Sequence, residues 1–520
     1  MRNGKREKRQ KVKVRKGWYE KLMLKIAADG ETSWRGPKVP NGGYASVVPD
    51  LMEWQGTSRH TCAQWPFVNG SASPIHGAQI GVHYFTREPV GFDPLTWFDH
   101  RFIFNPSVFI LSNPAVGKSS LLRKMMIGVI AQGTNCLVLG DRKNEHTRLI
   151  RLMGGQIIHL GPGRGKINVL DPGGVLEAVA RIKDECEDPA LAKELCDALL
   201  GDMHARRLNM VTGLIAIFRQ NRVTGHEKSI IDQALRWLHQ NERRIPILED
   251  VLRVLREAPA DVRRVANDWG DDKRYKQVIN AIENDLVGLC SGGGIGEMFN
   301  GETSEEVRRD RSVCFDIHSI DESDKDTLSA AYMACWSAGF GMINVAHALA
   351  DAGLEPGRRF FAVLDEFWQP LAASPGMVDR VNAITRLNRD KGVGVAYASH
   401  TMADLEAIPT EEDRNKARGI VDRCGAVIIG GLRREELVER VSKVTALMAE
   451  EIDLIVGWNM PPSLDQHEAE DADMPGRGKF LIKTSEAPGV PVDVLFTQRE
   501  RDENIHDTNK RIRKQEKVKA

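Results

Sequence analysis

Short apolar runs and segments with helical spacing alternate along most of the chain. The spacing predicts a strand at Ser107–Leu111, a helix at Lys118–Ile130 and a second strand at Cys136–Leu139. Further strand-like runs lie at Val313–Ile317, Phe360–Leu364, Gly394–Ala398 and Ala426–Ile429. Because strand, glycine-containing loop, helix and strand follow in this order, we predict an α/β domain with a parallel sheet.

The strand pattern stops over residues 174–290. Segments in this stretch instead carry apolar residues every three to four positions, at Lys228–Gln240, Pro246–Ala258 and Tyr275–Leu289. We therefore predict a mostly helical subdomain at 174–290, inserted between two parts of the α/β domain at 104–173 and 291–500. A mixed region, 17–103, precedes the α/β domain, and no internal repeat is visible.

One segment is long and uncharged enough to be compared with a membrane span. Leu328–Ala350 contains no Asp, Glu, Lys or Arg. Its large apolar side chains recur at intervals of four and three residues, at Leu328, Tyr332, Trp336, Phe340 and Ile343. That stripe, with Asn344 and His347 between small residues, favours a buried core helix over a membrane span.

Length and composition indicate a soluble globular protein of more than one domain. The chain has 520 residues, of which 28% are charged and 42% hydrophobic. Its eight cysteines are scattered, without the spacing of a metal site, which predicts reduced thiols and a cytoplasmic location. No signal peptide is visible at the start.

The net charge of zero hides two basic ends. Residues 1–16, expected to be a disordered arm, carry nine Lys or Arg against the single acid Glu7, and the tail at 501–520 is also basic. Such arms bind DNA through its phosphates, bind anionic membrane, or serve only as solubilising tails. The sequence leaves these three interpretations open.

The stretch SNPAVGKSSLL, from Ser112 to Leu122, resembles the phosphate-binding pattern G-x-x-x-x-G-K-[ST]. It follows an apolar strand and opens a helix, so backbone N–H groups and the positive helix end would face a phosphate. Lys118 would reach the β- and γ-phosphates of ATP, and Ser119 would ligate Mg²⁺. The candidate nucleotide-binding residues are Asn113, Pro114, Ala115, Val116, Gly117, Lys118, Ser119 and Ser120.

Ser112 replaces the first glycine of that pattern. Glycine permits a tight turn there, so we expect a side chain to cost of order 1 kcal/mol in backbone strain. Nucleotide binding should survive this change better than the rate of hydrolysis.

Two acids follow the apolar strand Phe360–Leu364. Asp365 is predicted to hold Mg²⁺, and Glu366 to polarise the attacking water. At the tip of the next strand, His400 is a candidate sensor of the γ-phosphate. Arg389, like Arg386, is a candidate finger inserted into a neighbouring subunit's site, although a solvated helix face explains both arginines equally well.

Several ordered motifs between Cys62 and Glu500 resemble the TraC-like conjugative-transfer ATPases of type IV secretion, in the HerA/FtsK superfamily. They are Trp65–Val82, Glu88–Pro94, Val138–Gly161, Lys166–Pro172, Gly294–Ser304, Ser312–Ile320, Val363–Leu371 and Gly476–Glu500. The resemblance implies a RecA-like ATPase with closing strands in the last segment. It also implies a homo-hexamer beneath a membrane channel, with channel components as partners and a peripheral position at the cytoplasmic face.

The chain departs from this family's pattern at Ser112 and at His400, where glutamine is usual, and only about a hundred residues precede the P-loop. The leading hypothesis is an ATPase that energises conjugative DNA transfer or type IV secretion. One alternative is a motor that itself pumps DNA, as in the FtsK and coupling-protein branches. Another is a scaffold that binds nucleotide with little turnover.

Overall fold

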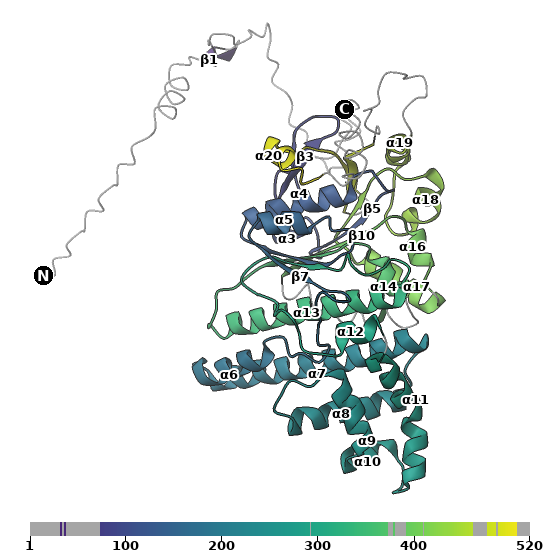
Figure 1. Cartoon of the computed structure of the whole chain (residues 1–520). Coiled ribbons are helices and arrows are strands. Elements are labelled where there is room, and N and C mark those ends of the chain that lie inside the picture. Colours follow the sequence, from purple (N-terminus) through teal and green to yellow (C-terminus); the bar gives the residue numbers. More distant parts are fainter. Residues whose placement is uncertain are drawn as a thin grey trace, which may run out of the picture. The chain divides into compact units, whose positions relative to one another are not determined.

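Figure 1 shows the computed structural model of the chain. It describes residues 73–291, 293–372, 378–379, 392–408, 410–460, 476–484 and 487–506, together with the backbone of 32–33 and 36–37. The chain divides into two units, Met1–Asn69 and Gly70–Ala520. The first contains the antiparallel pair β1 (Thr32–Ser33) and β2 (Gly36–Pro37). The basic arm at 1–16 and the tail beyond 506 lie outside the described residues.

An 11-stranded sheet, in the order β4-β3-β13-β12-β11-β5-β10-β9-β6-β8-β7, forms the centre of the second unit. Its parallel part contains β11 (Ala426–Ile429), β5 (Ser107–Leu111), β10 (Val393–Ser399), β9 (Phe360–Leu364), β6 (Asn135–Asp141), β8 (Val313–Asp316) and β7 (Gln156–His159). The strands predicted from the apolar runs are all present. The sequence pattern did not predict β7 as a strand.

The sheet continues beyond β11 as an antiparallel extension. Its strands are β12 (Lys479–Lys483), β13 (Val490–Val494), β3 (Gln79–His83) and β4 (Pro89–Gly91). β12 and β13 are the closing strands expected near the C-terminal end. β3 and β4 come from the region before the P-loop, so that region supplies strands to the same sheet as the P-loop.

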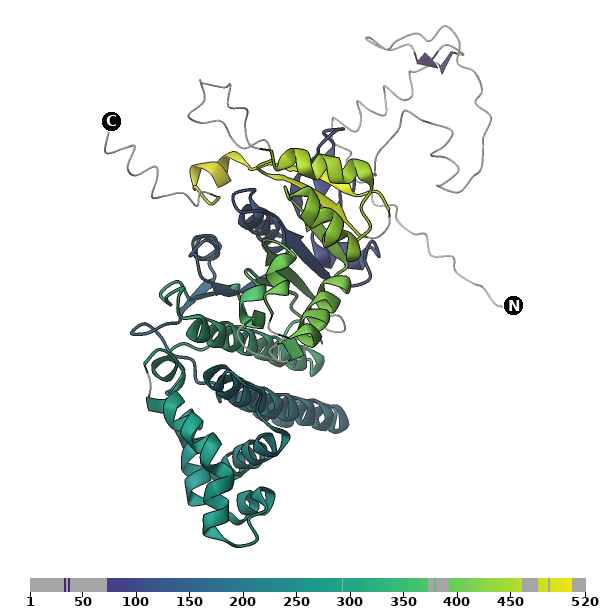
Figure 2. The same ribbon diagram turned by 90° about the vertical axis from the view of Figure 1, so that its right-hand side faces the viewer.

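Helices cover both faces of the sheet (Figures 1 and 2). Val108 and Ile110 of β5 pack on one face with α3 (Pro94–Asp99), α4 (Lys118–Ala131) and α5 (Thr147–Leu152). Phe109 and Leu111 pack on the other face with α13 (Lys325–Asp351). Burial on both faces explains why β5 is apolar at every inner position rather than alternating.

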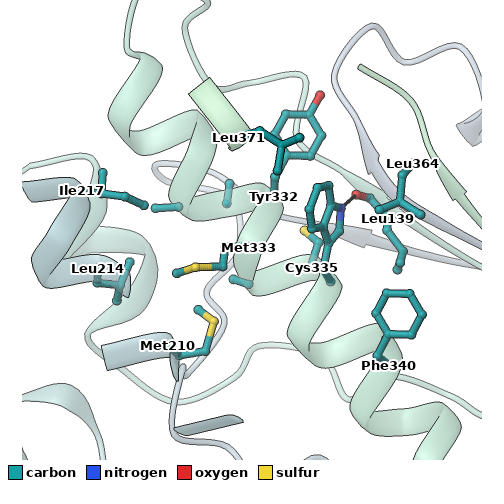
Figure 3. Close-up of a cluster of buried hydrophobic side chains, with 14 of the residues drawn as sticks. Leu139, Met210, Leu214, Ile217, Tyr332, Met333, Cys335, Phe340, Leu364 and Leu371 are labelled. Carbon is teal, nitrogen blue, oxygen red and sulfur yellow. Dashed lines mark hydrogen bonds between the residues drawn. The ribbon is translucent and has the colours of Figure 1, made fainter. Parts of the chain in front are cut away.

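α13 contains the uncharged segment compared above with a membrane span. Its apolar stripe is buried, and the Trp336 indole donates a hydrogen bond to the Leu139 carbonyl at 2.9 Å. Figure 3 shows Leu139 and Leu364 of the sheet on one side of this helix and Met210 and Leu214 of α7 on the other. The prediction of a buried core helix is therefore confirmed, and no helix among the described residues is long and apolar enough to span a membrane.

Helices fill the stretch between β7 and β8. They are α6 (Val175–Glu185), α7 (Pro189–Arg219), α8 (Gly225–Asn241), α9 (Leu248–Glu257), α10 (Ala260–Ala266), α11 (Asp272–Ser291) and α12 (Ile295–Phe299). Asp188 caps α7, and Thr224 and Glu227 form a capping box at the start of α8. α7 packs on α13, so this helical layer lies on the side of α13 away from the sheet (Figure 2).

Shorter helices complete the fold. They are α14 (Trp368–Ala372), α16 (Ala403–Glu406), α17 (Glu411–Asp422), α18 (Arg434–Glu439), the 3₁₀ turn Val441–Lys443, α19 (Ala449–Trp458) and α20 (Gln498–Asp502). α20 is fixed to the P-loop helix because the Lys124 ammonium donates to both Glu500 carboxylate oxygens, at 2.8 and 3.0 Å.

Candidate functional site

The P-loop connects the end of β5 to the start of α4. Gly117, which caps α4, has φ of 110°, a conformation that favours glycine. Ala115 also lies in the left-handed region, at φ of 69°. The first N–H groups of a helix have no partner within it, so those at the start of α4 are available to an anion. The loop therefore has the backbone arrangement of a phosphate site.

The backbone strain expected at Ser112 is absent, which corrects the prediction. Ser112 does not have a positive φ, whereas Ala115 does. Ser112 is fully buried and faces Gly430, where an added Cβ would lie 2.7 Å from the Ser112 Cβ. Gly430, directly after β11, thus leaves the space that the Ser112 side chain needs. The strain in this loop, of order 1 kcal/mol, lies at Ala115 instead.

Lys118 meets the two predicted acids. Its Nζ lies 3.4 Å from Asp365 Oδ1 and 3.9 Å from Glu366 Oε1, and the side chain is only 6% exposed. β5 and β9 both flank β10 in parallel, so their carboxyl ends reach the same edge of the sheet. Although within reach of these acids, Lys118 Nζ makes no hydrogen bond in the described part of the chain.

Glu366 accepts hydrogen bonds at both carboxylate oxygens. Lys143 Nζ and His400 Nε2 donate to Oε1 at 2.9 and 3.1 Å, and the Trp368 indole donates to Oε2 at 3.0 Å. Burial raises the pKa of Glu366, but the hydrogen bond from His400 and the charge of Lys118 outweigh it and hold that pKa well below its usual range. Glu366 is therefore ionised at neutral pH, as a group that polarises water must be.

Asp365 is ionised for a similar reason. Burial raises the pKa of Asp365. The charge of Lys118 and the hydrogen bond from His146 Nε2, at 3.3 Å, outweigh this effect, so the pKa of Asp365 lies well below its usual range. Glu366 follows it with φ of 54°, a strained conformation for glutamate.

The donor set suits Mg²⁺ better than a metal held by protein alone. No cluster of three or more His, Cys, Asp or Glu that could hold a metal lies within the described residues. Mg²⁺ prefers oxygen ligands and usually takes one or two from the protein, with waters and phosphates as the rest. The Ser119 hydroxyl and the Asp365 carboxylate, which the sequence predicts as the ligands, supply oxygen atoms of that kind.

Sequence reasoning missed two residues of the site, Lys143 and His146, which lie in the turn after β6. The Asp141 carboxylate organises this turn by accepting from the backbone N–H groups of Glu145, His146 and Thr147 at 2.8–2.9 Å. β6 is the direct neighbour of β9, which brings the turn beside the acids. The available signal was the charged GDRKNEH sequence at the end of a buried strand.

His400 lies at the tip of β10, as predicted. Its backbone N–H and that of Thr401 donate to the Asp404 carboxylate at 3.1 and 2.8 Å, which fixes the strand end. Its side chain contacts Glu366, so its role as a sensor of phosphate stays a prediction. Arg386 and Arg389 lie outside the described residues.

Comparison with known proteins identifies structures but no sequence relatives. No protein-family model and no curated protein matches the sequence. The structure is similar to that of VirB4 of Thermoanaerobacter pseudethanolicus, with a TM-score of 0.57 and 17% identity over 83% of this chain and 100% of that chain. This similarity confirms the α/β fold class.

The bacterial conjugative coupling protein TrwB matches more distantly. Its sulphate complex has a TM-score of 0.46 and 10% identity over 83% of this chain and 92% of that chain. A complex with ADP and Mg²⁺ has a TM-score of 0.43 and 13% identity over 76% and 85% of the two chains. We base no argument on these two structures.

Proposed function

We propose that this chain is an ATPase that hydrolyses ATP to energise conjugative DNA transfer or type IV secretion. The observation that carries the proposal is the position of the P-loop Lys118, whose ammonium lies beside the carboxylates of Asp365 and Glu366. The similarity of the fold to VirB4 supports the same assignment. ATP and Mg²⁺ are the cofactors that these residues would bind.

Each side chain has a distinct part in the reaction. The N–H groups at the start of α4 and the Lys118 ammonium bind the phosphates, and the lysine neutralises charge that develops on the γ-phosphoryl group. Ser119 and Asp365 would hold Mg²⁺, which would supply further neutralisation when bound. Glu366 orients the attacking water and favours loss of its proton.

Glu366 Oε1 must lose one of its two hydrogen bonds before that oxygen can orient water. Lys143, His400 and Trp368 occupy its oxygens in the structure. Lys143 is the most exposed of the donors to Oε1, with 45% of its side chain accessible. We infer that Lys143 gives way to the water, while His400 continues to position the carboxylate.

The assembly and partners belong to the same proposal. The chain would act as a homo-hexamer at the cytoplasmic face of a membrane, with secretion-channel components as partners. Arg389 would complete a neighbouring subunit's site, and the basic arms would contact DNA or anionic lipid.

If Arg389 acts in this way, mixing Arg389→Ala with Glu366→Gln chains should restore part of the turnover, because some interfaces then contain both intact residues. Absence of recovery in rings shown to exchange subunits would exclude that role.

Steady-state ATP hydrolysis by the purified full chain, with and without DNA, tests the function. We expect hydrolysis that Lys118→Ala abolishes. Strong stimulation by DNA would favour the DNA-pumping alternative. Tight ATP binding without turnover would instead favour the scaffold.

A further inference from the structure

His146 and Lys118 contact different oxygens of the Asp365 carboxylate. The His146 side chain is buried, and its Nε2 lies 3.3 Å from Asp365 Oδ2. Lys118 Nζ lies 3.4 Å from Oδ1, which also accepts the Glu366 N–H at 3.1 Å. The lowered pKa of Asp365 keeps the carboxylate ionised, and an ionised carboxylate only accepts hydrogen bonds, so His146 Nε2 carries the proton. His146 therefore restrains the rotation of this carboxylate and keeps Oδ1 on the side of the P-loop lysine.

The backbone of the turn after β6 fixes the position of His146. Asp141, which is buried, accepts from three successive backbone N–H groups of this turn, including that of His146 at 2.8 Å. Arg123, buried on α4, donates to the Glu145 carbonyl at 2.9 Å. The same turn is thus bonded to the helix that carries Ser119 and, through the His146 ring, to the carboxylate of the other predicted Mg²⁺ ligand.

We propose that His146 is a positioning residue that gives the nucleotide site its preference for Mg²⁺ over Ca²⁺. Mg²⁺ requires near-ideal octahedral geometry, whereas Ca²⁺ accepts flexible coordination by carboxylates that bind through one or two oxygens. A carboxylate held at Oδ2 presents Oδ1 in a fixed direction, which suits the more demanding ion. The inference rests on the proposed function, since it assigns Asp365 to a metal bound with nucleotide.

The contact has a measurable consequence for metal binding. Hydrogen-bond partners of metal-ligating groups typically contribute about 10- to 100-fold to metal affinity. If His146 is removed, the Asp365 carboxylate can rotate, and Mg²⁺ should lose more affinity than Ca²⁺ because it tolerates less variation in geometry. A purely structural histidine would instead weaken nucleotide binding to the same extent with and without metal.

Titration of a fluorescent, non-hydrolysable ATP analogue with the full chain, in Mg²⁺, in Ca²⁺ and in EDTA, tests the proposal without measuring hydrolysis. His146→Met and His146→Phe both remove the donor, and the second retains an aromatic ring. Each should raise the Mg²⁺ concentration needed for half-maximal metal-dependent binding about 10- to 100-fold, and the corresponding Ca²⁺ concentration by a smaller factor. His146→Gln keeps an N–H donor and should recover most of the Mg²⁺ affinity.

His159→Met is the matched control. The Nδ1 atom of His159, at the end of β7, lies 2.8 Å from Asp316 Oδ2, so this substitution removes a similar histidine–carboxylate contact at the end of another strand. We expect His159→Met to keep the wild-type dependence on both metals.

The measurements in EDTA separate positioning from structure. There the donor-free variants should bind the analogue as the wild type does, because the P-loop contacts to phosphate remain. An equal loss of affinity in EDTA and in Mg²⁺ would overturn the proposal, as would equal shifts for Mg²⁺ and Ca²⁺, or an unchanged Mg²⁺ requirement. A wild-type chain that binds no analogue under any condition would overturn the proposed function and this inference with it, whereas tight binding by the wild type with no effect of His146 would overturn the inference alone.

Discussion

Lys118 and Arg207 are both buried cations, 6% and 5% exposed, but their surroundings differ. Lys118 lies at the carboxyl edge of the sheet and faces two carboxylates. Arg207 lies between two helices and has no hydrogen-bonded carboxylate in the described part of the chain. The difference teaches that a carboxylate near a buried cation can balance its charge without accepting a hydrogen bond from it, as Asp171 does for Arg207. At Lys118 the acids likewise leave the ammonium donors free for phosphate.

The largest expected effect comes from removing the functional group of either Lys118 or Glu366. Lys118→Ala and Glu366→Gln should each lower ATP turnover about a hundredfold or more, since each removes an interaction needed in the transition state. Lys118→Ala should also weaken nucleotide binding, whereas Glu366→Gln should retain it. Hydrolysis and fluorescent-nucleotide titrations distinguish the two. Wild-type turnover in both variants would contradict the site assignment.

The pairing of Lys118 with two acids predicts a pH-dependent loss of stability. Lys118→Met should cost about 3 kcal/mol at pH 7, because it removes the buried ammonium that lies beside two buried carboxylates. The wild-type acids have lowered pKa values, so their contribution is present above about pH 4 and is lost as the pH falls toward those lowered values. In the variant the pKa values rise and the acids take up protons, so the difference in unfolding free energy should shrink from pH 7 to pH 4.

Arg207→Met provides the contrasting case in the same denaturation series. Its unfolding free energy relative to wild type should change less between pH 7 and pH 4, since no carboxylate in the described part of the chain loses a hydrogen bond. If the difference in unfolding free energy from wild type shrinks equally in both variants between pH 7 and pH 4, the two buried cations do not differ in this respect.

Substitutions of His400 and Lys143 should change the rate of turnover, through the position of Glu366, without changing nucleotide affinity. His400→Ala removes a hydrogen bond that holds the carboxylate, and we expect turnover to fall about tenfold at unchanged nucleotide affinity. His400→Gln keeps a donor and should restore part of the rate. Lys143→Met should lower turnover less than His400→Ala, because a water can replace its contact. A larger loss in Lys143→Met would show that Lys143 stays on Glu366 throughout the cycle.

The smallest effect concerns the two unusual positions of the P-loop. Ser112→Gly should destabilise the protein by about 0.5–1 kcal/mol, because glycine adds freedom to the unfolded chain without relieving strain. Ala115→Gly should be neutral or stabilise by about 1 kcal/mol, because it relieves a left-handed alanine. Denaturant unfolding of the two variants measures the difference. If Ser112→Gly instead stabilises the protein, the backbone strain lies at Ser112.

The sequence by itself predicted the parts of the molecule that depend on neighbours along the chain. The apolar runs identified the strands of the parallel sheet, because burial on both faces selects such runs. The order of strand, loop and helix predicted the P-loop, and the acids after an apolar strand made Asp365 and Glu366 candidates, which the structure places beside Lys118. The stripe on Leu328–Ala350 was enough to predict a buried helix.

Only the tertiary structure decided which distant segments share an edge of the sheet. The neighbouring positions of β6 and β9 bring Lys143 and His146 to the acids, and no local pattern encodes that order. The space for Ser112 comes from Gly430, on a different segment of the chain. The lack of an acceptor for Arg207 Nε among the described residues likewise depends on what α13 and the residues around Asp171 present to it. The physical reason is the same in each case: local sequence determines conformation and burial, whereas charge pairing and steric fit depend on three-dimensional neighbours.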